Sequence, residues 1–228
     1  SYPDMLRLAG AVPRIVDTTA ASGFRMSVDQ LEAAIGPRTM ALIVNSPSNP
    51  TGAVYSAEEL RALGEVAARR GLVVITDDIY EHLTARPVPH LGTLVPALRP
   101  RLVIVNSVSK SYAMTGWRIG YTAGPPELIR AMTVLQSQST TNPTSIAQAA
   151  AAAALTGPQA TVDAMAREFA ARREIIVRRL QQMPGVRTTV PEGAFYVFPD
   201  VSAFFGRSGP DGRVETAAAL ATHLLRHV

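Results

Sequence analysis

The most reactive candidate side chain in this sequence is Lys110, the only lysine among the 228 residues. It lies among serines and apolar residues in the segment SVSKSYAM, apart from the arginines that supply the rest of the positive charge. An amine acts as a nucleophile or as a base only while it is unprotonated, and partial burial near another cation lowers its pKa toward that state. We therefore interpret Lys110 as a reactive amine rather than as a solvated surface charge.

A carboxylate, a phenol and an amide follow two other predicted strands. Asp77 ends the apolar segment GLVVIT, and Tyr80 comes three residues later, so in the intervening turn both side chains can face one crevice, while Asp78 points elsewhere. Asn49 lies in the turn-rich segment NSPSNPTG, where an amide at the end of a parallel strand points toward the ligand crevice of an open sheet. The simpler alternatives are a helix N-cap for the aspartates and a plain loop for the asparagine.

Two hydroxyls and a guanidinium flank the lysine. Ser107, Ser109 and Arg118 offer the fork and the donors that bind a phosphate group, although they could equally be polar groups of a turn and a strand edge. An amine, a carboxylate, a phenol and an arginine are together what a protein needs to hold pyridoxal phosphate and to use it as an electron sink. This set of side chains therefore favours that cofactor.

Short apolar segments of strand length precede each of these candidates and alternate with helical stretches. The segments bounded by turn residues are 40–44, 72–75 and 102–105. Ser56 and Glu59 form a capping box at the start of the helix between the first two, and Gly71 follows its last turn. A strand, a helix and a strand in this order predict parallel strands, which deliver the candidate side chains to one edge of a sheet.

The remainder of the chain continues the α/β pattern. We predict a strand at 118–123, a helix that Pro126 opens, and strongly helical sequence from Asn142 onward. Thr156-Gly157-Pro158 breaks the helix, and the next one can run to about Met183. The turn PEGA then joins two predicted strands at 186–190 and 195–198, and a final helix begins near Val214. We expect residues 1–156 to form a large cofactor-binding domain and residues 157–228 a smaller α+β domain.

Composition narrows the class of protein. The chain is 47% hydrophobic and 18% charged, carries a net charge of +4, and has arginines in pairs on predicted helices rather than in one patch, so no nucleic-acid partner is expected. No apolar segment approaches the roughly 18 residues of a membrane span, and no signal peptide opens the chain, so a cytoplasmic location is the default. Cysteine is absent, and the four histidines lack a ligand spacing such as HExxH, so no metal site is predicted.

Five segments carry a resemblance to a known family. In order, NSPSNPTGAVYS, ITDDIYEHL, SVSKSYAMTGWRIGY, SQSTTNPTSIAQ and PEGAFYVF closely resemble the class I/II aminotransferases of pyridoxal-phosphate fold type I, in particular their bacterial aspartate aminotransferase branch. The resemblance covers essentially the whole chain. It implies a mostly parallel central sheet sandwiched by helices, a smaller α+β C-terminal domain, and a homodimer with active sites at the subunit interface. It also implies pyridoxal 5′-phosphate as cofactor and an amino acid, with aspartate as the first choice, and a 2-oxo acid as substrates.

The resemblance gives the candidate residues their roles. Lys110 is expected to bond covalently to the cofactor, Asp77 to pair with its pyridine nitrogen, and Tyr80 and Asn49 to donate hydrogen bonds to its ring oxygen. Asn49 also lies beside the substrate carboxylate in this family.

The other expected ligands belong to the phosphate group. Ser107 and Arg118 resemble the family's phosphate ligands, and Ser109 is a further candidate. Asn142 resembles a segment that the family brings close to the partner subunit's site.

The ends of the chain depart from the family pattern. The phosphate loop with its glycine, the ring-stacking aromatic and the N-terminal arm fall before Ser1, and the arginine for the substrate carboxylate falls after Val228, so the chain looks truncated at both ends and is expected to be inactive by itself. Three alternatives share the lysine site or the fold: a lyase or an acyl-CoA condensing enzyme, a transcription regulator that only senses the cofactor, and a catalytically silent fragment. Assay of oxo-acid-dependent amino transfer separates the first, and a winged-helix domain upstream would reveal the second.

Overall fold

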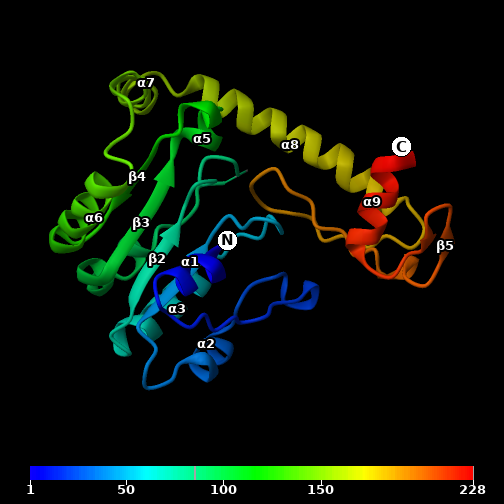
Figure 1. Ribbon diagram of the computed structural model, residues 1–228, viewed down its shortest axis with the longest axis horizontal. Helices are drawn as coiled ribbons and strands as arrows, with labels where there is room; N and C mark the ends of the chain where they lie inside the picture. The colour runs from blue at the N-terminus through cyan, green and yellow to red at the C-terminus, as the bar shows by residue number, and fades with distance from the viewer. Residues whose placement is uncertain (85, 228) are drawn as a thin grey trace.

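The computed structural model describes residues 1–84 and 86–227. The described residues form helices and strands joined by loops and short 3₁₀ turns (Figure 1). The helices are α1 (Tyr2–Leu8), α2 (Val28–Ala34), α3 (Ala57–Arg69), α4 (Leu91–Leu94), α5 (Val108–Ser111), α6 (Pro126–Ser139), α7 (Ser145–Thr156), α8 (Ala160–Gln181) and α9 (Ala217–His227). The strands are β1 (Ala41–Asn45), β2 (Val73–Asp77), β3 (Leu102–Ser107), β4 (Gly120–Ala123), β5 (Ser208–Gly209) and β6 (Gly212–Arg213).

The main sheet has the order β1-β2-β3-β4. Its first three strands are parallel, as the sequence predicts, and β4 returns antiparallel to β3. Asn45 lies opposite Asp77, Asp77 lies opposite Val105, and Ser107 lies opposite Gly120. The carboxyl ends of the three parallel strands therefore meet at one edge, which is where ligands bind in open α/β sheets.

Helix α3 covers one face of the sheet because its sequence supplies both a start signal and an apolar side. The predicted capping box is confirmed: Ser56 Oγ accepts from the Glu59 N–H at 3.1 Å, and Glu59 Oε2 accepts from the Ser56 N–H at 2.7 Å. A Cβ at Gly64 would lie 2.7 Å from Leu91, so glycine is what allows α4 to pack closely on α3. The main core contains buried side chains of this helix and of the sheet, namely Leu60, Leu63, Val66, Ala67, Val44, Val74 and Leu102.

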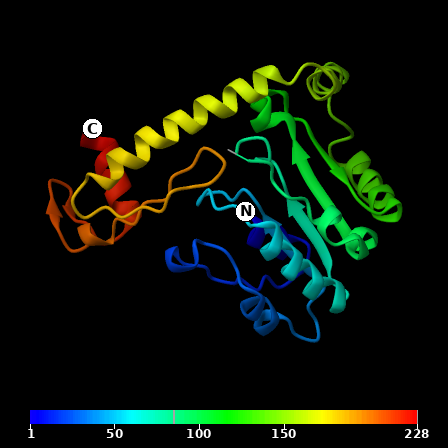
Figure 2. The same ribbon diagram turned by 180° about the vertical axis from the view of Figure 1, so that it is seen from behind.

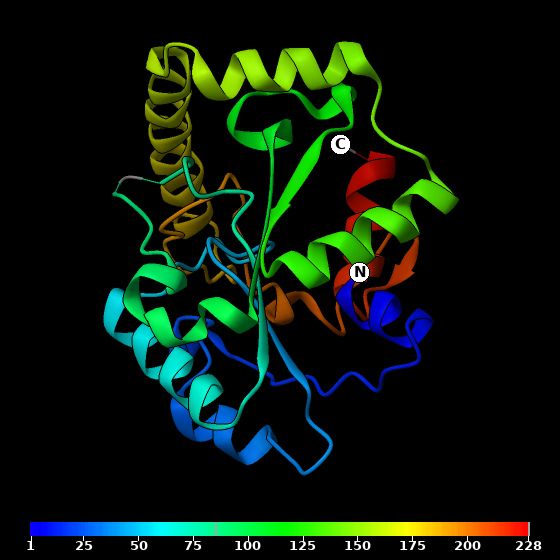
Figure 3. The same ribbon diagram turned by 90° about the vertical axis from the view of Figure 1, so that its left-hand side faces the viewer.

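Helices lie on both sides of the sheet. Figure 3 shows α2, α3 and α4 on one side, and α1 and α6 on the other. In the described residues no helix has the length and apolar character needed to cross a membrane.

The C-terminal part of the chain extends away from the sheet. Helix α8 runs from beside α5 and α7 toward the hairpin β5-β6 and α9, as Figures 1 and 2 show. It begins two residues after Pro158 and ends at Gln181, close to the predicted bounds, and α9 begins at Ala217 rather than near Val214. The division into domains 1–156 and 157–228 stays a prediction.

The predicted strands at 186–190 and 195–198 are wrong. No strand forms in these residues; they are loops with two isolated bridges, Thr84 to Gly193 and Arg187 to Asp200. The backbone N–H groups of the turn PEGA bond elsewhere: the Gly193 N–H donates to the Gly52 carbonyl at 2.9 Å, and the Ala194 N–H donates to Leu83 at 2.8 Å. The alternating apolar pattern therefore reflects a loop that packs on other loops rather than a hairpin.

Candidate functional site

The end of β2 brings a carboxylate to the sheet edge. Side chains alternate along a strand, so Asp77 and Ser107 emerge on the face opposite α3. One oxygen of Asp77 accepts a hydrogen bond from the hydroxyl of Tyr2 in α1, and the other accepts from the Ile79 N–H at 3.3 Å. Burial and the hydrogen bond to Asp77 raise the pKa of the Tyr2 phenol above its ordinary value. No sequence pattern pointed to Tyr2, which lies 75 residues from Asp77 along the chain.

The neighbouring carboxylate, Asp78, belongs to a different set of contacts. It is 9% exposed and accepts from the Thr76 hydroxyl at 3.3 Å, and Nδ1 of His90 lies 3.6 Å from it. The Asp78 carboxylate, 3.6 Å from the imidazole, raises the pKa of His90 above its ordinary value, against the effect of burial. The two aspartates thus point into separate surroundings, as the sequence interpretation expects.

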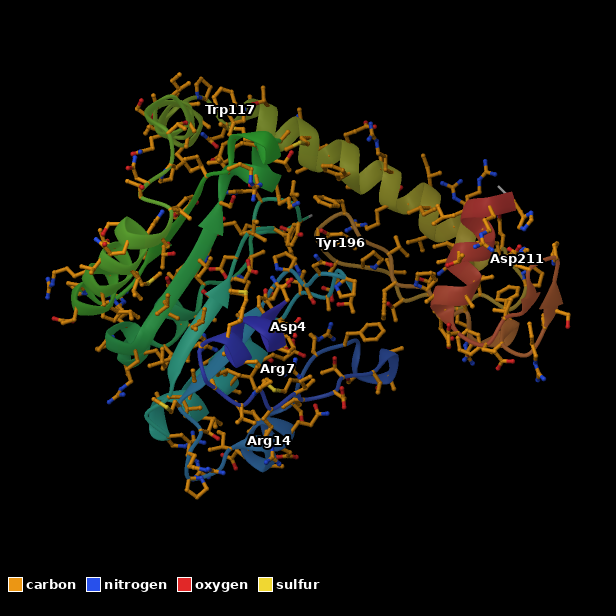
Figure 4. The ribbon with its side chains drawn as sticks, viewed as in Figure 1. Asp4, Arg7, Arg14, Trp117, Tyr196 and Asp211 are labelled. Carbon is orange, nitrogen blue, oxygen red and sulfur yellow. The ribbon has the colours of Figure 1, made fainter. Side chains whose placement is uncertain are left out.

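Tyr80 sits in an aromatic cluster beside the sheet edge. It is 4% exposed, its hydroxyl hydrogen-bonds the hydroxyl of Tyr196, and its ring meets those of Phe195 and Tyr196 edge to face, each at 5.5 Å between centroids. Burial and the bond to Tyr196 raise the pKa of the Tyr80 phenol, whereas the adjacent Asn49 amide acts in the opposite direction. Figure 4 shows Tyr196 on the loop that returns from the end of α8 toward the sheet.

Lys110 lies in the single turn of α5 that follows β3. Its Nζ is 5.8 Å from the centre of the Phe195 ring, which in turn packs against Tyr80. Phe195 therefore neighbours both the candidate amine and the candidate phenol. Sequence reasoning identified the segment PEGAFYVF as a family feature but assigned no role to Phe195 or Tyr196.

Ser107 organises the lysine turn. Its Oγ caps α5 by accepting from the Ser109 N–H at 3.0 Å, and it donates to the Ile119 carbonyl at 2.7 Å. The Ser109 hydroxyl lies 2.8 Å from the same oxygen. Arg118 has left-handed backbone angles, φ 54° and ψ 47°, and its guanidinium donates to the Thr115 carbonyl at 2.8 Å. The chain thus folds back on itself between the end of β3 and the start of β4.

A cavity of about 300 Å³ collects four of the candidate residues. Asp77, Ser107, Ser109 and Arg118 all line it, together with Ile79, Val105, Asn106, Ile119 and Gly120. Three candidates lie outside the lining of this cavity, namely Lys110, Tyr80 and Asn49. Tyr80 and Asn49 lie beside each other, and the Phe195 ring contacts both Lys110 and Tyr80. The structure therefore gathers the candidates at one sheet edge, in two adjoining groups.

The buried amide of Asn106 connects this cavity to Glu81 and the two histidines near Glu81. Asn106 Nδ2 donates to Glu81 Oε1 at 2.6 Å, and Asn106 Oδ1 accepts from the Ser107 N–H at 2.7 Å. Glu81 also faces His82 and His90, at 3.4 Å each. Asn106 bonds Ser107, and Ser107 caps the lysine turn. Glu81 and Asn106 therefore help to position that turn, although neither is placed against the lysine itself.

Asn142 lies beside Arg118 in a second, more open hollow of about 670 Å³, which Trp117 and Pro143 also line. Figure 4 shows Trp117 close to α7. The side chain of Arg118 thus borders both hollows.

Comparisons of this chain with known proteins all match aminotransferases. The family model described as aminotransferase class I and II matches residues 1–228. The chain is 50% identical to an aspartate aminotransferase of Geobacillus stearothermophilus over 222 residues, 96% of this chain and 56% of that protein. It is 49% identical to an aspartate/prephenate aminotransferase of Cereibacter sphaeroides over 229 residues, 99% of this chain and 57% of that protein.

A solved structure confirms the predicted fold class. The crystal structure of an aspartate aminotransferase from Rhizobium meliloti superposes with a TM-score of 0.93 at 43% sequence identity, covering 99% of this chain and 57% of that one. The chain therefore spans slightly more than half the length of these relatives.

Proposed function

Because the chain belongs to the class I and II aminotransferases, we propose that it provides the cofactor-binding part of a pyridoxal-phosphate-dependent aminotransferase. The proposed reaction moves an amino group from an amino acid to a 2-oxo acid. The observation that supports it most is the convergence of Asp77, Ser107, Ser109 and Arg118 on one cavity next to the lysine turn.

The chemistry of this donor set fits pyridoxal phosphate. Two serine hydroxyls and a guanidinium match the phosphate group, because charge-assisted hydrogen bonds to an anion are strong and a planar fork binds two of its oxygens at once. The carboxylate of Asp77 matches a protonated pyridine nitrogen. A volume of about 300 Å³ lies at the small end of the range for ligand pockets.

The lysine supplies the amine chemistry. When bound, pyridoxal phosphate provides an electron sink for the charge left when a substrate loses its α-proton. In the proposal, Lys110 Nζ is the nucleophile that holds the cofactor, and once released it accepts that proton as general base. The aromatic ring of Phe195 lies next to this amine, 5.8 Å from Nζ to the ring centre.

The remaining candidate residues orient the ring. In the proposal, the Asp77 carboxylate keeps the pyridine nitrogen of the cofactor protonated. The side chains of Tyr80 and Asn49 donate hydrogen bonds to the oxygen on the same ring. The clusters described above support this role, since Tyr196 fixes the Tyr80 hydroxyl and Asn49 lies beside it.

Aspartate is the proposed amino donor. It is the substrate in the name of the Geobacillus stearothermophilus relative, while that of the Cereibacter sphaeroides relative adds prephenate. A dicarboxylic amino acid is therefore the first substrate to test, and prephenate is the second acceptor.

A homodimer is the proposed assembly. Support comes from apolar side chains that project from α6 and the start of α7 into solvent. They are Leu128, Met132, Val134, Leu135 and Ile146, with exposed fractions from 37% to 74%. Apolar patches of this kind mark association surfaces. The cytoplasmic location stays a prediction.

Labelling of the lysine tests the proposal directly. We expect the purified chain, incubated with pyridoxal phosphate and then reduced with borohydride, to carry one cofactor on the peptide that contains Lys110. The chain has a single lysine, so the N-terminal amine is the other amine to be mapped. Lys110→Ala serves as the control and should lose the label while keeping the wild-type circular dichroism spectrum. Label spread between the N-terminus and Lys110, or retained in the variant, would contradict the assignment.

A further inference from the structure

Three side chains with metal-binding chemistry meet in the C-terminal part, away from the lysine site. Asp211 lies in the turn of the hairpin β5-β6, and His223 and His227 lie on α9. His223 Nδ1 is 3.3 Å from Asp211 Oδ2, and His227 Nε2 is 3.0 Å from the same oxygen. Figure 4 shows Asp211 beside α9.

The helix and the hairpin are both suited to this convergence. The two histidines are four residues apart, which places them on one face of α9, and their rings are 4.7 Å apart between centroids. The His223 ring packs over Gly209, where a Cβ would lie 3.3 Å from it. Gly212, with φ of 102°, makes the tight turn that brings Asp211 toward the helix.

The separations match those of atoms that share one metal ion. Two donors that each lie about 2.1 Å from a metal are roughly 3.0 to 3.4 Å apart at octahedral or tetrahedral angles. The two measured separations, 3.0 Å and 3.3 Å, fall in this range, and all three donor atoms lie within 4.8 Å of one another. The remaining carboxylate oxygen, Oδ1, faces Arg226 at 3.5 Å, which leaves Oδ2 directed at the imidazoles.

We propose that Asp211, His223 and His227 bind one divalent transition-metal ion. Zn²⁺ is the ion with which the site is to be tested first. Imidazole and carboxylate ligands suit zinc, nickel and copper, and three protein ligands leave coordination positions for water. The ion joins the hairpin β5-β6 to α9, so its role is structural. This proposal departs from the sequence-based expectation of no metal site, which considered spacing within the histidines and not the carboxylate that the hairpin contributes.

A second acidic group serves as an internal comparison. Asp78, Glu81 and His90 also approach one another, but they offer one imidazole, and their carboxylates already accept hydrogen bonds from Thr76 and Asn106. The carboxylates of this group are therefore already satisfied by hydrogen bonds from the protein, and the group lies near the lysine turn.

Metal titration of the full chain tests the proposal without reference to cofactor or turnover. After removal of metals with a chelator, the protein is titrated with Zn²⁺ against a chromophoric competitor, and with Co²⁺ while visible absorption is recorded. We expect one ion per chain, a Co²⁺ spectrum with imidazole coordination, and an increase of Tm at saturating Zn²⁺. Asp211→Asn, His223→Gln and His227→Gln should each lower the affinity at least tenfold.

Matched histidine variants elsewhere in the chain complete the design. His82→Gln and His90→Gln remove imidazoles elsewhere and should leave the stoichiometry, the affinity and the Co²⁺ spectrum unchanged. Circular dichroism of the metal-free variants establishes that each is folded, and the single Asp211→Asn change keeps the shape of the side chain. Absence of a Co²⁺ spectrum in the wild type would overturn the proposal. So would an affinity that the three ligand variants leave unchanged, or one that His82→Gln or His90→Gln abolishes.

Discussion

At the scale of single residues, two adjacent carboxylates differ in what surrounds them. Asp77 lines the cavity beside Ser107 and Arg118, whereas Asp78 is nearly buried against Thr76 and His90. The difference follows from strand geometry, since consecutive side chains at a strand end point to opposite sides.

This difference predicts unequal effects of one substitution at the two positions. Asp77→Asn should weaken retention of pyridoxal phosphate by roughly 10- to 100-fold, because a hydrogen bond to a charged group is lost. Asp78→Asn should change retention less than twofold, with fluorescence titration of the cofactor as the measurement. Equal losses in the two variants would show that the proposed partner of the pyridine nitrogen is wrongly assigned.

Arg118 provides a second prediction at this scale. Arg118→Lys should weaken cofactor binding by about 1 to 3 kcal/mol, because an ammonium cannot reproduce the planar fork on a phosphate. Arg130→Lys, an exposed change on α6 that also keeps the charge, is the control and should leave binding unchanged. Wild-type affinity in Arg118→Lys would mean that this arginine serves only its backbone contact with Thr115.

At the scale of elements, the start of α3 combines a cap with an ion pair. Ser56 and Glu59 cap each other, and Arg25 Nε donates to Glu59 Oε1 at 2.9 Å. Arg25 also reaches Glu192 in the PEGA turn at 3.0 Å, so this helix start is tied to the C-terminal part of the chain. Burial by itself would raise the pKa of the Glu59 carboxyl, but the Ser56 N–H and Arg25 together hold it below its ordinary value of 4.5.

A pH dependence of stability follows. A carboxyl whose pKa is lowered by folding stabilises the protein above its unfolded pKa and loses that effect as the pH falls through the folded value. Glu59→Gln should therefore lower the free energy of unfolding at pH 7 by up to about 1 kcal/mol, since the pair is partly exposed, and the deficit should shrink below pH 4.5. Urea denaturation at several pH values measures it. Glu65→Gln, on the exposed side of α3, is the control, and a deficit that persists at low pH would contradict the argument.

Sequence reasoning succeeded where local signals specify an element. The parallel strands, the Ser56 cap and the bounds of α8 follow from apolar periodicity, capping residues and a Gly-Pro break, all of which act over a few residues. It failed at 186–198, where backbone partners come from Gly52 and Leu83. It also missed Tyr2, Phe195 and Tyr196, because their contacts with the candidate site span long stretches of chain. Contacts of this kind depend on tertiary packing, which local patterns do not encode.

At the scale of the whole molecule, α8 carries the chain from the sheet to the separate group formed by β5, β6 and α9. Between α8 and this group, the PEGA turn (191–194) comes back to the loops at the sheet edge, where Arg25 and Arg86 both pair with Glu192. The C-terminal residues thus hold the aromatic pair Phe195 and Tyr196 against Tyr80. The candidate site is built from both parts of the chain.

The exposed apolar side chains predict association of this chain. We expect sedimentation to show concentration-dependent oligomers, and Leu135→Gln, on a residue 72% exposed in α6, to shift the population toward monomer. Leu8→Gln, on a residue 90% exposed in α1, is the matched control and should leave the distribution unchanged. Monomers in the wild type at high concentration would contradict the proposed homodimer surface.

Turnover provides the last prediction. The chain spans 56% of the Geobacillus stearothermophilus relative, so we expect it to label at Lys110 with pyridoxal phosphate but to transfer amino groups from aspartate to 2-oxoglutarate far more slowly than that enzyme. A coupled assay of both proteins under the same conditions measures this. Comparable rates would show that the described residues suffice for catalysis.

The return of the chain from β3 to β4 has a consequence for how such a protein changes over time. The Ser107 hydroxyl bonds the Ile119 carbonyl, and Ser107 pairs with Gly120, so the loop that carries Ser109, Lys110 and Arg118 is closed by its own ends. The candidate amine and the candidate anion ligands are therefore held in register by one continuous stretch of sequence, 102–123. Sequence changes elsewhere in the chain can therefore accumulate without disturbing the relative positions of these three side chains.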